Sequence, residues 1–288
     1  MKVFVTGGTG FTGSRVVPLL LKNGYEVRCL YRPTSDRSVP LRAQPTIEWV
    51  LGDVSDPKAL ASSMGGSDVL VNIASLGFGH ADSIIRAAQD AGIQRAIFVS
   101  TTAIFTQLNA KSKSVRMAAE QAIESSGLKY TILRPTMIYG GPRDRNMWRL
   151  IRFMRYSPVI PVFGDGNYLQ QPIYVGDVAQ AILSCLCNDQ TIGKSYNIAG
   201  KVPLTYNQVI DSIAGQMKKR VWKIHISSVP VISLLKFFER SHILLPIKAE
   251  QVLRLNENKN FDYEEAQKDF GFGPLSFEQG IELELESR

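Results

Sequence analysis

Short apolar runs alternate with helical patterns through the first half of the chain. Runs rich in Val, Ile, Leu and Phe, bounded by Gly, Pro or charged residues, have the composition of buried strands. Between them, apolar residues recur every three or four positions, which is typical of amphipathic helices. The expected strands are 2–6, 26–32, 47–53, 68–75, 95–102 and 130–135, and the expected helices are 14–24, 56–66, 81–92 and 114–127. Strands that alternate with helices predict βαβ units and a parallel sheet covered on both faces.

The pattern changes after Pro135, where the regular alternation ends. Residues 147–156 have the spacing of a short amphipathic helix, and residues 162–183 indicate a loop, a short strand and a helix. Residues 194–200 have the composition of a late strand that returns to the sheet, whereas the chain from Lys201 onward is mostly helical with loops. We therefore expect a second, smaller lobe that is interleaved with the first.

The composition narrows the class of protein. With 288 residues, 44% of them apolar, the chain can bury a large core. A net charge of +7 favours acidic small-molecule partners, and no motif of interleaved aromatic and basic residues indicates nucleic-acid binding. No apolar run approaches the ~20 residues of a membrane span. We therefore expect a cytoplasmic protein with no membrane span and no nucleic-acid partner, and a homodimer stays open.

Cysteine and histidine are too few and too scattered for a metal centre. The three cysteines, Cys29, Cys185 and Cys187, cannot build a disulfide framework and match no zinc spacing. The three histidines lie far apart in the sequence. We therefore expect no bound metal and a reducing compartment.

Three glycines follow the first expected strand. In VFVTGGTGFTGSRVV, Gly7, Gly10 and Gly13 have a G-x-x-G-x-x-G spacing between that strand and the next helix. Glycine lets the backbone approach a pyrophosphate, to which the helix N-terminus offers free N–H groups and a partial positive charge. This arrangement predicts a Rossmann-type, doubly wound α/β fold. The expected bounds are 1–145 for the dinucleotide-binding domain, with 169–200 returning to it, and 146–168 and 201–288 for a smaller C-terminal substrate lobe.

Several motifs, in the same order along the chain, resemble the NAD-dependent epimerase/dehydratase family. This is the extended and atypical branch of the short-chain dehydrogenase/reductases. TGGTGFTG resembles the family's opening fingerprint, LRPTMIYGG at 133–141 its LRPxxxYG segment, and IYVGDVAQAI at 173–182 its VxDVAxAI segment. The tail at 261–282 resembles its terminal motif. The cofactor contacts that the glycine motif and this resemblance imply are Gly7, Thr9, Gly10, Phe11, Thr12, Gly13, Asp53, Val54, Ala74, Ser75, Ser100 and Pro135.

The end of the second strand bears on the choice of nicotinamide cofactor. NAD-specific members of this family carry a carboxylate there, which accepts hydrogen bonds from the ribose diol and repels a 2′-phosphate. Here Tyr31 takes that place and Arg32 follows. An arginine can pair with a phosphate through two N–H groups and stack on adenine, and Arg37 could assist. We therefore favour NADP(H) over NAD(H). The alternative is that Arg32 is a solvated loop residue and Asp36 contacts the ribose.

The resemblance also implies a proton-transfer pair that this sequence lacks. Active members carry a Tyr and, four residues later, a Lys. Here these positions hold Ser112 and Arg116, and no tyrosine lies between residues 31 and 130. A serine hydroxyl is too weak an acid to replace a phenol, and arginine keeps its charge, so it can bind ribose hydroxyls but cannot act as a base. The family's substrate-binding hydroxyl is retained as Thr102, with Ser100 and Thr101 beside it.

Three interpretations of the missing pair stay open. Lys111, Lys113 or Tyr139 could substitute for it; water or substrate could handle the proton; or the protein could bind NADP(H) without turnover, as similar redox regulators and respiratory-complex accessory proteins do. We favour an oxidoreductase or epimerase-like enzyme that acts on a small carbonyl or alcohol. The alternative is a non-catalytic NADP(H)-binding redox sensor or an accessory or assembly protein.

The substrate is expected beyond the C-terminal strand ends, against the second lobe. Gln170 and Gln171 replace an Arg-Asp pair that nucleotide-sugar epimerases carry, which argues against a nucleotide-diphosphate substrate. Asp177 is expected to cap the helix that follows it. Five arginines either bind an anionic substrate or form a solvated basic face. They are Arg143, Arg145, Arg149, Arg152 and Arg155.

Overall fold

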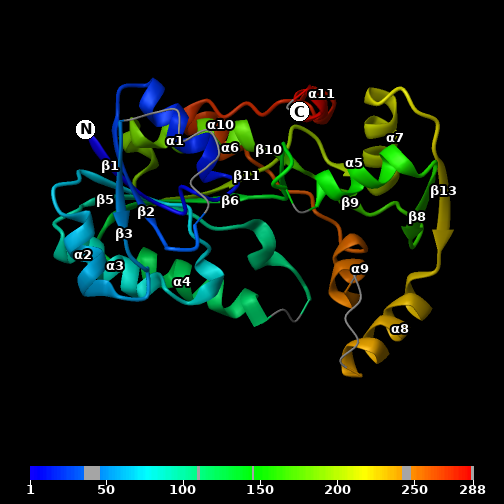
Figure 1. Cartoon of the computed structure of the whole chain (residues 1–288), viewed down its shortest axis with the longest axis horizontal. Coiled ribbons are helices and arrows are strands. Elements are labelled where there is room, and N and C mark those ends of the chain that lie inside the picture. Colours follow the sequence, from blue (N-terminus) through cyan, green and yellow to red (C-terminus); the bar gives the residue numbers. More distant parts are fainter. Residues whose placement is uncertain (36–45, 109–110, 145, 242–247, 287–288) are drawn as a thin grey trace.

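A seven-stranded parallel sheet forms the centre of the protein (Figure 1). The computed structural model describes residues 1–35, 46–108, 111–144, 146–241 and 248–286. The sheet has the order β11-β6-β5-β4-β1-β2-β3. Its strands are β1 (Lys2–Thr6), β2 (Glu26–Tyr31), β3 (Ile47–Leu51), β4 (Val69–Asn72), β5 (Arg95–Val99), β6 (Lys129–Pro135) and β11 (Lys194–Ile198). This confirms the predicted doubly wound sheet, whose order reverses between β1 and β4, the switch point at which such folds bind ligands.

Helices cover both faces of the sheet because successive residues of a strand point to opposite sides. In β1, Val3 and Val5 enter one apolar core, whereas Phe4, between them, enters the other. All three side chains are fully buried. Burial on both faces explains why the strands are almost continuously apolar in sequence. On the first face lie α1 (Gly13–Lys22) and α6 (Val175–Leu186), and on the second α2 (Pro57–Met64), α3 (Ala81–Asp90) and α4 (Lys111–Glu124).

The second lobe has its own apolar core, formed by side chains such as Ile151, Val162, Ile210 and Ile281. Its short strands pair in twos: β7 (Ile138–Tyr139) with β10 (Ile173–Tyr174), β9 (Leu169–Gln170) with β12 (Leu204–Thr205), and β8 (Val159–Phe163) with β13 (Trp222–Ile226). The helices of this part of the chain are α5 (Met147–Tyr156), α7 (Tyr206–Gln216), α8 (Ser228–Arg240), α9 (Ala249–Leu255), α10 (Glu264–Phe270) and α11 (Phe277–Glu286).

The two halves of the sequence are interleaved in space. β11 pairs with β6 at the edge of the large sheet, although it follows the second lobe's first segments in the sequence. Ala266 and Phe272, in and after α10, are buried in the same core as α1 and α6. This part of the tail therefore packs on the sheet, although its position in the sequence suggests the second lobe.

Candidate cofactor and active site

The turn between β1 and α1 requires glycine at two places. Gly7 has a φ of +71°, and a Cβ there would lie 2.7 Å from the Ala74 backbone nitrogen. A Cβ on Gly13 would lie 2.3 Å from the Gly7 carbonyl oxygen. The N–H of Gly10 closes the turn by donating to that same oxygen at 2.9 Å. Glycine therefore allows α1 to begin tightly against β1 and beside the end of β4.

At the N-terminus of α1, the N–H groups of Ser14 and Arg15 donate to the Gly10 and Thr12 carbonyl oxygens at 2.9 and 3.0 Å, so an anion would be bound by the N–H groups just before them. The Thr12 side chain makes no capping hydrogen bond, and the first turn of the helix holds no carboxylate. The first N–H groups of a helix have no partner within it, and the helix dipole makes this end positive. The turn that runs through Thr9 and Phe11 thus has the features of a diphosphate site.

The segment that follows β6 lies over this turn. A guanidinium nitrogen of Arg143 donates to the Thr9 carbonyl oxygen at 2.8 Å. A Cβ on Gly141 would come within 4.0 Å of the Phe11 ring. The chain entering the second lobe is therefore anchored to the glycine turn, a contact that no sequence pattern indicated.

The other arginines of the predicted cluster do not gather with Arg143. Arg149 and Arg152 are exposed on α5. The Arg155 guanidinium lies 4.8 Å from the centre of the Trp148 ring, where a cation–π contact holds it. Arg145 lies outside the described residues. Within the described ranges, the solvated-face interpretation therefore fits Arg149 and Arg152.

Arg32 and Asp53 lie beside each other because β2 and β3 pair in register, Tyr31 opposite Leu51. The hydroxyl and N–H of Ser55 donate to the Asp53 carboxylate and lower its pKa, and the positive charge of Arg32 adds to this shift. The Arg32 side chain is exposed. Arg37, expected to assist Arg32 at the 2′-phosphate, and Asp36, the alternative ribose contact, lie outside the described residues.

The end of β4 brings Ala74 and Ser75 to the glycine turn. The Ala74 N–H donates to the Thr6 hydroxyl at 3.4 Å, and the Ser75 hydroxyl accepts from Gly77 N–H at 3.3 Å. Val54, after β3, is tied to α3 because Ser83 donates to its carbonyl at 2.6 Å.

A buried ionic network fixes the end of β5. The Ser100 hydroxyl donates to Glu120 of α4 at 2.5 Å, and Arg134 donates to the same carboxylate at 2.6 and 2.9 Å. Glu120 is only 4% exposed. Ser100 therefore serves to join β5, α4 and β6. Sequence reasoning missed this network because its three residues come from separate parts of the chain.

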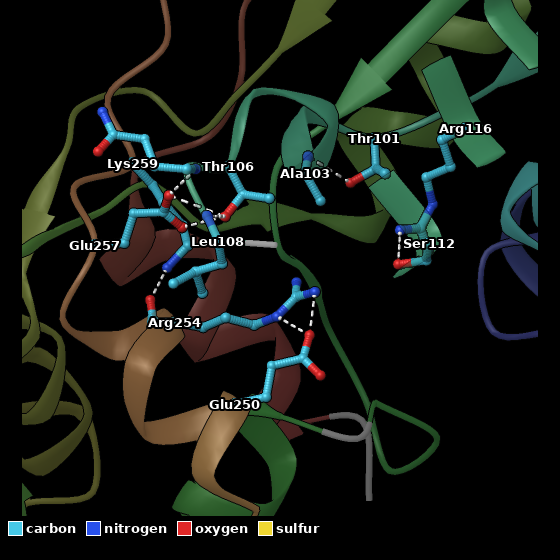
Figure 2. A network of polar contacts seen from close by, with 11 residues as sticks. Thr101, Ala103, Thr106, Leu108, Ser112, Arg116, Glu250, Arg254, Glu257 and Lys259 are labelled. Carbon is cyan, nitrogen blue, oxygen red and sulfur yellow. Dashed lines mark hydrogen bonds and ion pairs between the residues drawn. The ribbon is translucent and has the colours of Figure 1, made fainter. Parts of the chain in front are cut away.

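Ser112 and Arg116 lie one turn apart on α4, and the Arg116 guanidinium donates to the Ser112 hydroxyl at 2.8 Å (Figure 2). A Cβ on Gly77 would lie 3.1 Å from that guanidinium, so Arg116 packs against the loop that carries Ala74 and Ser75. Burial lowers the Arg116 pKa, and the positive charge of Arg254 in α9 lowers it further.

The two described substitutes for the missing tyrosine are engaged elsewhere. The Lys113 ammonium donates to the Thr106 carbonyl at 2.6 Å. Tyr139 is 1% exposed, its hydroxyl donates to the Phe277 carbonyl at 3.4 Å, and burial raises its pKa far above the usual range. This environment argues against Tyr139 as a proton donor. The Lys111 side chain lies outside the described residues.

Two threonines follow β5 in different environments. Thr102 is 6% exposed, and its hydroxyl donates to the Pro135 carbonyl at 3.4 Å. Thr101 is half-buried, and its hydroxyl accepts from Ala103 N–H at 3.2 Å, which leaves its own hydrogen free to donate. Thr101 is thus the better placed of the two to meet a substrate oxygen.

Polar residues that follow α9 contact the loop after β5 (Figure 2). Glu257 accepts hydrogen bonds from the Thr106 hydroxyl, at 2.7 and 2.9 Å, and from Gln107 N–H at 2.6 Å. The Lys259 ammonium donates to Gln170 at 3.0 Å and to the Arg254 carbonyl. Burial lowers the pKa of Lys259 to about 8. These contacts join the second lobe to the loop after β5.

Gln171, after β9, and Asp177, in α6, both have structural partners. Gln171 donates to the Gly200 carbonyl at 2.8 Å and accepts from Phe261 N–H at 2.8 Å. The sequence suggested that Asp177 caps α6. It does not, because the helix begins two residues earlier, at Val175. Its carboxylate accepts from Leu275 N–H at 3.0 Å, and burial raises its pKa to about 6.

The described part of the chain contains neither a membrane-spanning helix nor a candidate metal cluster. No helix there is long and apolar enough to cross a membrane. No group of three or more His, Cys, Asp or Glu side chains there could hold a metal ion.

Several known proteins are similar to this chain in sequence. A family model described as NAD(P)H-binding matches residues 7–189. The chain is 26% identical, over 273 residues, to the mitochondrial NADH dehydrogenase (ubiquinone) 1 alpha subcomplex subunit 9 of Arabidopsis thaliana, which aligns 88% of this chain and 67% of that protein. It is 31% identical, over 203 residues, to the ceramide reductase of Caulobacter vibrioides, with 66% and 62% aligned. It is 24% identical, over 254 residues, to a photosystem II assembly factor of Trieres chinensis, with 83% and 77% aligned.

Solved structures share the fold over the whole chain. UDP-glucose 4-epimerase from Thermotoga maritima superposes with a TM-score of 0.79 at 19% identity, covering 100% of this chain and 98% of that one. UDP-glucuronic acid 4-epimerase from Bacillus cereus, solved with UDP-glucuronic acid and NAD, gives the same score, identity and coverage. At this identity the likeness establishes the Rossmann-type fold with its second lobe.

Proposed function

Since this chain belongs to the NAD(P)H-binding family and has the fold of the NAD-dependent epimerase/dehydratases, we propose that it is an NADP(H)-dependent oxidoreductase. Its substrate is a small carbonyl or alcohol. The observation that carries the proposal is the glycine turn at the open N-terminus of α1. Gly7 and Gly13 pack so closely that a Cβ would strike backbone, and this compactness brings the main chain to a pyrophosphate.

The residues around the turn fit the rest of such a cofactor. By the resemblance of their positions in the sequence, Asp53 and Val54 would border the adenine of a bound cofactor, Ala74 and Ser75 would border its nicotinamide ribose, and Pro135 would reach its carboxamide. Arg32 pairs with the 2′-phosphate, since its side chain is exposed while the neighbouring Asp53 carboxylate is held by Ser55.

When bound, the reduced nicotinamide supplies a hydride to the substrate carbonyl carbon. The chain stabilises the charge that develops on the substrate oxygen. Ser112 accepts a hydrogen bond from Arg116, so its own O–H is free to donate, and the charge of Arg116 strengthens that donor. Thr101 offers a second hydroxyl hydrogen. Preorganised donors of this kind act as an oxyanion hole, and water supplies the proton that a serine cannot release at neutral pH.

Two arginines on opposite lobes support an anionic substrate. Arg116 extends from α4, and Arg254 extends from α9 towards the same region (Figure 2). Arg254 is paired with Glu250 at 2.7 Å, whereas Arg116 donates to the uncharged Ser112. The positive charge of Arg254 acts on Arg116, and a carboxylate or phosphate between them relieves this repulsion.

A second function keeps the cofactor and omits turnover. Its support is the Ser112–Arg116 pair, which lacks the family's phenol, together with two relatives named as a subunit of NADH dehydrogenase and as an assembly factor. In this case the protein senses the redox state of NADP(H) or supports a partner.

Fluorescence titration with NADPH and NADH tests the cofactor assignment. We expect NADPH to bind more tightly, and Arg32→Glu to weaken NADPH by about tenfold or more while NADH changes little, because only the phosphate contact is lost. Arg86→Glu, an exposed arginine on α3, is the matched control. Equal weakening of both nucleotides would contradict the role of Arg32, and failure of both to bind would contradict the site itself.

Turnover is tested by following NADPH oxidation with small aldehydes and ketones, each offered with and without a carboxylate or phosphate. We expect Ser112→Ala to lower kcat by about 10²-fold, as loss of one oxyanion donor does. Arg254→Gln should raise KM for the anionic substrates alone, and Arg149→Gln, which changes an exposed arginine on α5, is the control. Tight NADPH binding without oxidation of any compound would reject the enzyme and support the second function.

A further inference from the structure

The outer edge of the second lobe exposes a cluster of large apolar side chains. β13 and α8 lie there, far from the seven-stranded sheet (Figure 1). Trp222 is 72% exposed, Val229 71% and Phe237 63%. Ile224, Ile226 and Leu234 are also exposed. Monomeric proteins rarely leave such residues clustered in one place, and an apolar cluster of this kind marks an interaction site. We call residues 222–240 the β13–α8 surface.

Strand alternation explains why these side chains are not covered. Trp222, Ile224 and Ile226 share one face of β13, and Lys223 and His225 share the other. The polar face contacts α7, where Lys223 pairs with Asp211 at 2.7 Å and His225 hydrogen-bonds to the Asn207 side chain at 3.2 Å. The apolar face of β13 therefore points away from its own lobe.

α8 repeats this arrangement. Leu235 is buried against Ala249 and Val252 of α9, in a cluster separate from the main core of the lobe. Val229, Leu234 and Phe237 remain exposed on the same helix. The buried contact attaches α8 to α9 and leaves a second apolar stripe available to a partner.

The β13–α8 surface and the residues just before it are strongly basic. Residues 218–241 hold six Lys and Arg against one Glu, a net charge of +5 where the whole chain has +7. The single carboxylate, Glu239, accepts a hydrogen bond from Ala249 N–H, which points it towards α9. A second copy of this chain would bring like charges together across the surface, which disfavours self-association there. The basic residues are Lys218, Lys219, Arg220, Lys223, Lys236 and Arg240.

We propose that the β13–α8 surface docks the protein on a membrane that carries anionic lipids. Exposed Trp and Phe enter the boundary between headgroups and acyl chains, while the surrounding Lys and Arg contact anionic headgroups. Among the described residues no helix could cross a bilayer, so this attachment is peripheral and reversible. It uses no residue of the cofactor site and stands independently of the redox proposal.

Vesicle cosedimentation tests the docking. The full chain should sediment with vesicles of phosphatidylcholine and phosphatidylserine, much less with phosphatidylcholine alone, and binding should fall as salt is raised. Trp222 emission should shift to the blue on binding, and Trp222→Phe should abolish that shift. Binding to both vesicle types with equal affinity, or to neither, overturns the proposal.

Matched variants distinguish vesicle binding through the β13–α8 surface from non-specific binding. Trp222→Ser with Phe237→Ser should weaken vesicle binding by at least about tenfold, from the apolar area withdrawn. Lys236→Glu with Arg240→Glu should remove the preference for anionic lipid. Leu51→Ser changes an apolar side chain on β3 that is 57% exposed and lies outside the surface, and this variant should bind as the unaltered chain does. Circular dichroism checks that each variant is folded. An equal loss with Leu51→Ser overturns the assignment, as does a dimer that only the Trp222 and Phe237 variant disrupts.

Discussion

Glu284 of α11 is expected to make the stability of the protein depend strongly on pH. Its side chain is fully buried, and burial beside the Asp144 carboxylate raises its pKa from an ordinary 4.5 to about 8, although the Gly141 backbone and Arg155 partly oppose this. The folded state therefore holds this proton more tightly than the unfolded chain. The resulting stability is full below pH 4.5 and is lost as the pH rises through about 8. At ~1.4 kcal/mol per pH unit, the loss reaches at most about 5 kcal/mol.

Glu284→Gln keeps the shape of the side chain and removes its titration. We expect the variant and the unaltered chain to unfold with similar free energies at the acidic end of this window. Above pH 8 the variant should be more stable by up to about 5 kcal/mol. Urea denaturation followed by circular dichroism across this range measures both curves, and Glu282→Gln, exposed on the same helix, is the control. Curves that stay parallel at every pH would refute the reasoning.

Further predictions concern glycine and the buried ionic network. Gly13→Ala should abolish NADPH binding in a fluorescence titration, because its Cβ would lie 2.3 Å from a carbonyl oxygen. Gly215→Ala, in α7 with no atom within 4 Å of the added Cβ, should bind normally and melt at a higher temperature, by about 0.5–1 kcal/mol of stability. Glu120→Ala should destabilise the fold by about 3–5 kcal/mol in urea, because it leaves Arg134 partly buried without its carboxylate. Glu250→Ala breaks an exposed pair and should cost below about 1 kcal/mol, so equal losses would contradict the ranking.

Local patterns predicted the parts of this fold that local physics determines. A strand buried on both faces needs a continuous apolar run. β1 and β4 have one, so their positions could be predicted from the sequence. The glycine turn could also be predicted. Gly7 and Gly13 lie against backbone atoms of the same βα unit or of the segment after β4, where a larger residue does not fit.

Contacts between residues far apart in the sequence could not be predicted from the sequence. Ser100, Glu120 and Arg134 come from three separate segments, and the sequence of one segment does not indicate its partners in the others. Asp177 was expected to cap its helix, yet its partner is Leu275, 98 residues away. The hydrogen bond between Ser112 and Arg116 follows from helical spacing, whereas the approach of Arg254 depends on how the second lobe folds back.

The first strand has a consequence for the whole molecule. Val3 and Val5 fill one core and Phe4 the other, so a single inserted or deleted residue in β1 would exchange every side chain between the two layers. Loss of β1 would therefore remove buried side chains from both apolar cores at once. Five residues near the amino terminus thus bind the two helical layers into a single cooperative unit, and this stretch should tolerate substitutions of similar size far better than any change of length.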